Sequence, residues 1–114
     1  VVESAILMEQ GIAISACPPD SGYSPLIAAQ AADELISIKG IQASFVLAER
    51  EGAISISGRS LGEINVQLIL EKLGGGGHLA VAGAQLKGAT MDAAVNRLTQ
   101  AVHEYLQESG MGQP

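Results

Sequence analysis

Four successive glycines followed by a histidine, Gly74 to Gly77 and then His78, are the residues whose types and spacing most readily suggest chemistry. Glycine accepts positive φ angles and has no Cβ, so a glycine run can direct successive N–H groups at a phosphate. His78 could donate a hydrogen bond to a phosphate oxygen or transfer a proton to a leaving group. Packing or helix capping does not explain four glycines, so we expect a ligand to approach this backbone closely. The alternative is a flexible loop with a surface histidine.

A second candidate segment, residues 57–65, lies where a predicted strand ends and a predicted helix begins. The guanidinium group of Arg59 could hold a phosphate through two parallel hydrogen bonds, assisted by the hydroxyl of Ser60 and the N-terminus of the helix. Ser60 and Glu63 also have the spacing of a capping box, which predicts that Ser60 caps this helix. Capping by Ser60 does not exclude binding by Arg59, although Arg59 could instead be a solvated charge.

Known motifs for phosphates and metal ions do not fit these segments. A P-loop has Lys and then Ser or Thr after its last glycine, where this sequence has His78 and Leu79. Residues 75–80 match the spacing of a dinucleotide-binding loop, but that loop follows a strand, whereas an amphipathic helix is predicted before these glycines. Two-metal hydrolysis needs several converging Asp and His ligands, and the chain has three Asp and two His. We therefore expect neither a metal site nor a catalytic residue in this chain.

The elements that must position these residues begin with the end of a connecting helix within residues 1–10 and a strand over 11–16. Ser24 and Pro25 predict the start of a helix that runs to about residue 37. Small apolar side chains recur along it at helical spacing, which predicts a stripe that lies close on a sheet. The stripe consists of Ala28, Ala31, Ala32 and Leu35.

The second half of the chain is predicted to continue with a hairpin of strands at 43–47 and 53–57. A helix over 62–73, a short strand at 84–86 and a last helix capped by Thr90 follow. The resulting order, β-α-β-β-α-β-α, predicts an α/β fold in which a mixed β-sheet is covered by helices.

Composition bounds the classes of protein that the chain can belong to. The 114 residues, 47% of them apolar, suit one compact domain, which we place at 11–109 with a disordered tail at 110–114. The formal charge of −6 with scattered Lys and Arg favours a small phosphorylated ligand over a long nucleic acid. The single cysteine, Cys17, excludes an intrachain disulfide, suits a reducing cytoplasm and is expected to be an inert thiol.

Two further features concern the context of the chain. No apolar run approaches the roughly 20 residues that a membrane helix needs, so we expect no membrane contact by this segment. Because the sequence starts at Val1 rather than at a methionine, we expect it to be part of a larger protein.

The stretch from Ile56 to Val66, followed by Gly74 to His78 and by Ala82-Gly83, resembles the DHH-associated C-terminal domain of DHH-family phosphoesterases. Residues 31–47 are further similar to the membrane-anchored bacterial cyclic di-AMP phosphodiesterases. The resemblance extends from Ile12 to about Leu106, and its two motifs together are specific to the family.

The resemblance implies how the candidate residues divide the work. In that family a preceding DHH domain supplies Asp and His ligands for two manganese ions, and the associated domain closes over the cleft and holds the substrate. Arg59 and His78 would then contact a phosphate. Gly74 to Gly77 would shape the nucleotide pocket, and Ser60 and Asn65 would help to orient the ligand.

The resemblance also implies partners and a location. The ligand would be a cyclic dinucleotide or a short oligonucleotide, and the partner would be the DHH domain of the same chain, with a homodimer as a further option. The domain would lie on the cytoplasmic side of a membrane-anchored bacterial protein. By itself it is expected to hold no cofactor and to be inactive, as one part of a hydrolase.

Three functions remain open at this point. The leading hypothesis is the substrate-binding domain of a phosphodiesterase that converts cyclic di-AMP to a linear dinucleotide. A second is an oligoribonuclease or single-strand exonuclease, because relatives share the glycine-histidine loop. A third is a non-catalytic RNA-binding or oligomerisation module, like the related domains that end alanyl-tRNA synthetases, although the charge of −6 argues against it.

Overall fold

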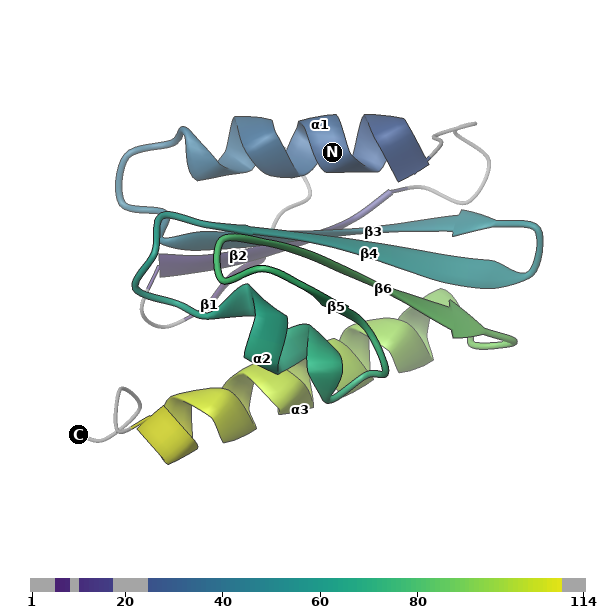
Figure 1. The fold of residues 1–114 in the computed structure, drawn as a ribbon. Coiled ribbons are helices and arrows are strands. Elements are labelled where there is room, and N and C mark those ends of the chain that lie inside the picture. Colours follow the sequence, from purple (N-terminus) through teal and green to yellow (C-terminus); the bar gives the residue numbers. More distant parts are fainter. Residues whose placement is uncertain (1–5, 9–10, 18–24, 110–114) are drawn as a thin grey trace.

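The computed structural model describes residues 6–8, 11–17 and 25–109. Within this part of the chain, a sheet lies between one helix on one face and two helices on the other, an arrangement that can be followed in Figure 1. In chain order the elements are β1 (Ile6–Met8), β2 (Ile12–Ala16), α1 (Pro25–Ile36), β3 (Ala43–Arg50), β4 (Ala53–Ser60), α2 (Val66–Glu71), β5 (Gly76–Gly77), β6 (Val81–Lys87) and α3 (Met91–Ser109).

The sheet is mixed, as predicted. Its strand order is β1-β2-β3-β4-β6-β5, and of the described strand pairs β2 and β3 are parallel while the others are antiparallel. A parallel pair needs a crossover connection, which α1 provides between β2 and β3. The predicted order of elements is therefore confirmed, with β1 and β5 as two additional strands.

The predicted end of a connecting helix within residues 1–10 is wrong for Ile6–Met8, which form β1. This strand pairs antiparallel with β2, with Ile6 opposite Ile14 and Met8 opposite Ile12. Its place is set by backbone pairing with β2, which a three-residue apolar run cannot reveal by its own periodicity. The rest of 1–10, the predicted cap at Ser24 and the tail at 110–114 lie outside the described residues.

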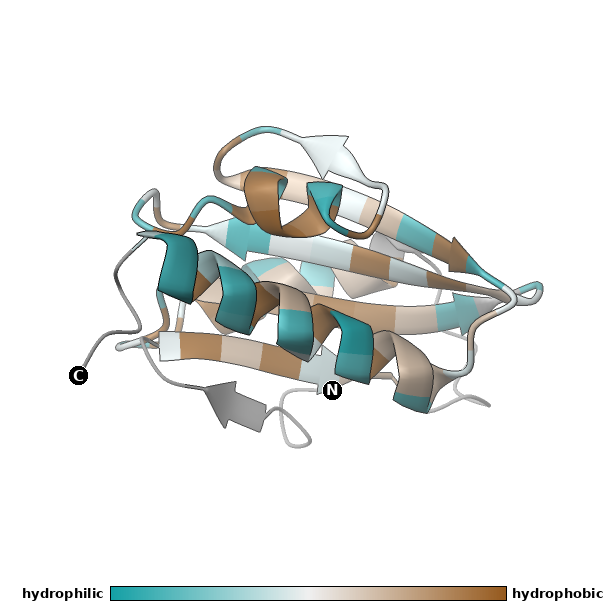
Figure 2. Cartoon of the chain, turned by 90° about the horizontal axis from the view of Figure 1, so that it is seen from below, coloured by the Kyte–Doolittle hydropathy of each residue, from teal (hydrophilic) through white to brown (hydrophobic). Residues whose placement is uncertain are grey.

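Two apolar cores lie on the two faces of the sheet. On one face, the predicted stripe of α1 is buried against Val46 and Ala48 of β3. On the other face, α2 and α3 cover a larger core around Phe45, Ile54 and Ile56. α3 turns its hydrophilic residues outward (Figure 2), as expected of an amphipathic helix. The sheet is thus covered on both sides, and β3 contributes alternate side chains to each core, Phe45 and Leu47 to one and Val46 and Ala48 to the other.

The β3–β4 hairpin is longer than predicted because its pairing continues without interruption from Ala43↔Ser60 to Arg50↔Ala53. Only Glu51 and Gly52 remain for the turn, and both have positive φ angles, 54° and 78°. These angles are those of a type I′ turn, whose twist matches that of the strands. Among the described residues, Glu51 is the only one other than glycine with a positive φ.

We predict that Glu51→Asn stabilises the protein. Asparagine tolerates the left-handed backbone region better than glutamate, so the substitution should raise the free energy of unfolding by about 0.5–1 kcal/mol. Urea unfolding followed by circular dichroism measures this difference. Gly52→Ala is the opposite case, because it places a Cβ at a φ of 78°, and it should destabilise. An equal effect of both variants would contradict the assignment of the turn.

Candidate ligand-binding site

The first glycine of the run ends α2. Gly74 has a φ of 85°, its N–H donates to the carbonyl of Glu71 at 3.1 Å, and the N–H of Gly75 donates to the carbonyl of Leu70 at 2.8 Å. A left-handed residue after the last turn, with such bonds back into the helix, is a common helix C-terminus in proteins. The fold therefore requires Gly74 whether or not a ligand is present.

Two further glycines are required by the close approach of this segment to β6. A Cβ on Gly75 would collide with the carbonyl oxygen of Gly83 and lie 2.6 Å from the Cβ of Ala84. A Cβ on Gly77 would lie 2.5 Å from the carbonyl oxygen of Val81. These obstacles are mostly backbone atoms, which cannot move aside without shifting β6. Gly75 and Gly77 are therefore explained by packing.

Gly76 is the exception. A Cβ built on it meets no atom within 4 Å, and its φ lies outside the left-handed region. The expectation that packing and capping leave the whole run unexplained is thus wrong for Gly74, Gly75 and Gly77. It holds for Gly76, where the fold itself does not demand a glycine. If a ligand approaches this backbone, Gly76 is where the missing Cβ matters.

His78 begins the tight turn between β5 and β6. Its backbone N–H donates to the carbonyl of Val81 at 2.7 Å. The same turn is fastened to its surroundings by two bonds, from the N–H of Ser60 to the carbonyl of Ala80 (2.9 Å) and from the N–H of Val66 to the carbonyl of Leu79 (3.1 Å). The turn therefore lies beside the end of β4 and the start of α2.

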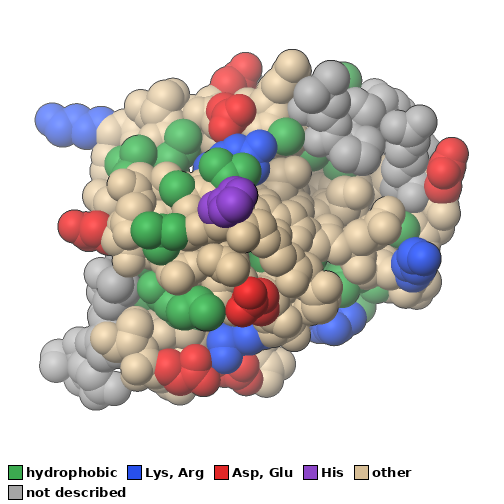
Figure 3. Space-filling view, in the orientation of Figure 1, with side chains coloured by type: hydrophobic (Ala, Val, Ile, Leu, Met, Phe, Trp, Pro, Cys, Tyr) green, Lys and Arg blue, Asp and Glu red, His purple; other side chains and the backbone are tan. Residues whose placement is uncertain are grey.

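The His78 side chain is exposed, and so are its neighbours Leu79 (45%) and Val81 (48%). In the space-filling view a histidine is seen at the surface among hydrophobic side chains (Figure 3). An imidazole in this position can reach a ligand without any rearrangement of the fold.

Arg59 lies at the same end of the sheet, opposite Val81 in the β4–β6 pairing. Its Nε donates to Oδ1 of Asp33 on α1 at 2.8 Å, and its Nη1 donates to the carbonyl of Gly58 at 2.9 Å. The side chain is only 17% exposed, so Arg59 is not the freely solvated charge that the sequence allowed. The structure thus brings Arg59 and His78 to either side of Val81.

A strip of small residues crosses the sheet next to Arg59. Ser57 on β4 pairs with Gly83 on β6, which in turn pairs with Gly76 on β5. Because side chains alternate along a strand, Ser57 and Arg59 face the same side, which is the side of α1. α1 packs over β3 and β4, while Gly83 on β6 is exposed. We call Ser57, Gly83 and Gly76 the glycine-serine strip. Because these residues have a short side chain or none, the backbone of the sheet lies close to the surface here, next to the side chain of Arg59.

Ser60 and Asn65 take part in turns rather than in the predicted capping box. Ser60 is the last residue of β4, and its Oγ accepts a hydrogen bond from the N–H of Gly62 at 2.8 Å. Asn65 is the N-cap of α2, and its Oδ1 accepts from the N–H of Leu68 at 3.1 Å. The prediction that Ser60 and Glu63 cap the helix is therefore wrong, because strand pairing holds Ser60 and the helix begins only at Val66.

Sequence reasoning missed the roles of Asp33 and Gly83. Asp33 fits an ordinary helix pattern and lies 26 residues before its partner Arg59, so no local spacing signals the pair. Gly83 occurs in the family motif, but its place in the glycine-serine strip follows from strand pairing. The roles of Arg59, Ser60, Asn65, Gly74 to Gly77 and His78 in binding remain predictions.

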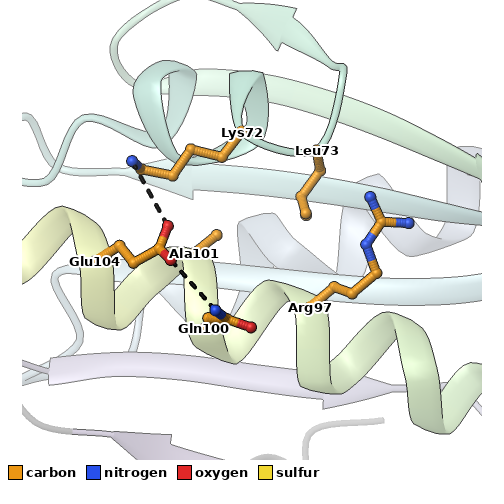
Figure 4. A pocket seen from close by; sticks show the side chains of 6 residues that line it. All are labelled: Lys72, Leu73, Arg97, Gln100, Ala101 and Glu104. Atoms are coloured by element: carbon orange, nitrogen blue, oxygen red, sulfur yellow. Dashed lines mark hydrogen bonds and ion pairs between the residues drawn. The ribbon is translucent and has the colours of Figure 1, made fainter.

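A hollow of about 190 Å³ lies away from these residues, between α2 and α3 (Figure 4). Three of its polar side chains are linked, since Lys72 Nζ lies 3.8 Å from Glu104 and Gln100 donates to Glu104 at 3.3 Å. Lys72 Nζ also lies 3.0 Å from Glu108. Its lining consists of Lys72, Leu73, Arg97, Gln100, Ala101 and Glu104. None of the predicted site residues lines this hollow, so we interpret it as a groove between the packed helices α2 and α3.

Other chemistry is limited within the described residues. No group of three or more His, Cys, Asp and Glu side chains there could hold a metal ion. Cys17 is buried, and this burial raises the pKa of its thiol, so it stays protonated at neutral pH and is a poor nucleophile. Within the same part of the chain, the helices are too short or too polar to cross a membrane.

Comparison with known protein families matches the DHHA1 domain over residues 9–108. The cyclic-di-AMP phosphodiesterase PdeA of Listeria monocytogenes is 49% identical over 106 residues, covering 92% of this chain and 16% of that protein. The cyclic-di-AMP phosphodiesterase GdpP of Geobacillus thermodenitrificans is 44% identical over 108 residues, covering 94% of this chain and 16% of that protein. This chain therefore spans only a small part of the length of these relatives.

Among solved structures, an exopolyphosphatase-related protein from Bacteroides fragilis is similar, with a TM-score of 0.78 and 29% sequence identity. The similarity covers 92% of this chain and 32% of that one. The arrangement of sheet and helices described above is thus shared with a longer protein.

We predict that alanine at adjacent glycines has very different effects on stability. Gly75→Ala should lower the free energy of unfolding by about 1–3 kcal/mol, because its Cβ meets the backbone of β6. Gly76→Ala should change it by less than about 0.5 kcal/mol, because the same Cβ meets open space. Urea unfolding of both variants measures the contrast. Equal losses would mean that the glycine run does not pack as described.

Proposed function

Because this chain belongs to the DHHA1 domain family, we propose that it is the substrate-binding domain of a phosphodiesterase that hydrolyses cyclic di-AMP to a linear dinucleotide. Two relatives at 49% and 44% identity are named cyclic-di-AMP phosphodiesterases, which supports this substrate. The single observation that carries the proposal is Gly76, a glycine that the fold does not need, on the glycine-serine strip beside Arg59.

The proposed binding mode combines the positive charge of Arg59 with the glycine-serine strip, where few side-chain atoms cover the backbone. A guanidinium has five N–H donors, and in Arg59 one bonds Asp33 and one bonds the carbonyl of Gly58, which leaves donors for a phosphate. Without Cβ atoms at Gly76 and Gly83, a nucleotide can lie against the peptide backbone. His78 can add a hydrogen bond from the adjacent turn. A planar, phosphorylated ligand suits such a surface.

The proposal separates binding from bond cleavage. The described residues offer no ligand set for metal ions, so this chain would hold and orient the phosphate while cleavage takes place elsewhere. The resemblance to DHH-family phosphoesterases supports a DHH domain of the same polypeptide as partner, with two manganese ions bound there. It also supports a place on the cytoplasmic side of a membrane-anchored protein.

We predict that Arg59→Ala, His78→Ala and Gly76→Ala in the complete phosphodiesterase each lower kcat/KM for cyclic di-AMP. The two side-chain variants should lose roughly one to three orders of magnitude, as expected when a donor to a reacting phosphate is removed. Gly76→Ala should act by steric exclusion and raise KM more than it lowers kcat. Steady-state kinetics and a thermal melt on each variant give the two readouts.

Arg97→Ala and His103→Ala are the matched controls, because both residues are exposed on α3. They remove the same chemical groups and should stay within about twofold of the parent enzyme. If Arg59→Ala and His78→Ala also stayed within twofold while folding normally, the site would lie elsewhere.

The choice between a cyclic and a linear substrate follows from a separate comparison. We predict that the complete enzyme hydrolyses cyclic di-AMP faster than short linear RNA at equal concentration, measured as kcat/KM for each. A preference for the linear substrate by orders of magnitude would instead support an oligoribonuclease or exonuclease.

A further inference from the structure

We propose that Asp33 is a positioning residue that holds the guanidinium of Arg59 in place for the ligand phosphate. This inference rests on the proposed function, in which Arg59 contacts that phosphate. The direct observation is the 2.8 Å bond from Arg59 Nε to Asp33 Oδ1, which joins α1 to β4.

The backbone position of Asp33 is itself held by a buried hydrogen bond to the preceding residue, Ala32. The hydroxyl of Ser44 donates to the carbonyl of Ala32 at 2.7 Å, and both residues are fully buried. Ser44 is also the direct neighbour of Arg59 in the β3–β4 pairing. The helix position that carries Asp33 is therefore tied to the strand position that adjoins Arg59. The position of the Asp33 carboxylate relative to the Arg59 guanidinium is therefore restricted by the fold.

The bonds that Arg59 already makes leave its terminal nitrogens available. Asp33 occupies the Nε–H group, and the carbonyl of Gly58 occupies one N–H of Nη1. The two N–H groups of Nη2 and the second one of Nη1 remain, which suffices for a two-point contact with a phosphate. Asp33 thus restricts the conformation of the Arg59 side chain and leaves the N–H groups of Nη1 and Nη2 that an anion would contact.

A purely structural ion pair would give a different pattern of effects. The Asp33 side chain is 61% exposed, and pairs of this kind contribute little to stability because water screens them. Positioning instead acts on binding, because a long side chain that is already ordered loses less freedom when the ligand arrives. If Asp33 only competed with the ligand for Arg59, removing its carboxylate would strengthen binding.

The test uses the complete phosphodiesterase with cyclic di-AMP as the probe. Asp33→Ala should raise KM about three- to tenfold, the effect of ordering one long side chain, with kcat changed by less than twofold and an unaltered melting temperature. Asp33→Asn keeps an oxygen that can accept from Nε and should restore part of the loss. Glu34→Gln is the matched control, since it removes a neighbouring exposed carboxylate of α1 and should leave KM unchanged.

A double-mutant cycle with Arg59→Ala establishes whether Asp33 acts through Arg59. Asp33→Ala should have no further effect on KM in the Arg59→Ala background. Persistence of the full effect there, or an unchanged or lowered KM for Asp33→Ala alone, would overturn the positioning role. In those cases a large loss for Arg59→Ala alone would leave the proposed function standing, whereas an Arg59→Ala enzyme as active as the parent would refute the proposed function as well.

Discussion

The close approach of the glycine run to β6 is the constraint on which the candidate site depends. Gly75 and Gly77 bring the backbone of this segment against the carbonyls of Gly83 and Val81, where no side chain fits. Because β5 is held this closely, the turn that begins at His78 is fixed beside the end of β4. The glycines therefore act first as a packing device. Gly76 differs from the other three glycines of the run, because neither its φ angle nor a neighbouring atom excludes a Cβ there.

Electrostatics at this end of the sheet is arranged around a single guanidinium. The chain carries a formal charge of −6, which by itself disfavours an anionic ligand. Arg59 is held between α1 and the sheet and is mostly buried, so its charge is screened by water less than that of a surface lysine. A single well-placed guanidinium can thus attract an anionic ligand locally, although the overall charge of the chain is negative.

The sequence predicted well those elements that local periodicity defines. The stripe of α1 is buried as its spacing indicated, and the hairpin of β3 and β4 follows from alternation of Ile54 and Ile56 with serines. The errors arose where tertiary pairing overrides a local signal. Ser60 and Glu63 have the spacing of a capping box, yet pairing of Ser60 with Ala43 makes Ser60 the last residue of β4 rather than a helix cap. β1 likewise exists only through its partner β2.

The sequence proposed residues for the candidate site, whose roles in binding stay predictions, but it did not show how the fold holds these residues in place. A run of glycines signals close approach without saying what approaches, and here neighbouring backbone accounts for most of it. The Asp33–Arg59 pair could not be predicted, because the two residues meet only when α1 is laid across β3 and β4. Contacts between distant segments carry no pattern in a single sequence.

The parallel pairing of β2 with β3 also bears on how the protein folds. β3 and β4 pair as a hairpin of neighbouring segments, whereas β2 pairs with β3 across the whole of α1. Closing a longer loop costs more chain entropy, so the hairpin is expected to form before β2 joins it. The strand that carries Arg59 would then be in place before the helix that carries its counter-ion has docked. Late docking of α1 would make this ion pair a marker of the completed native state.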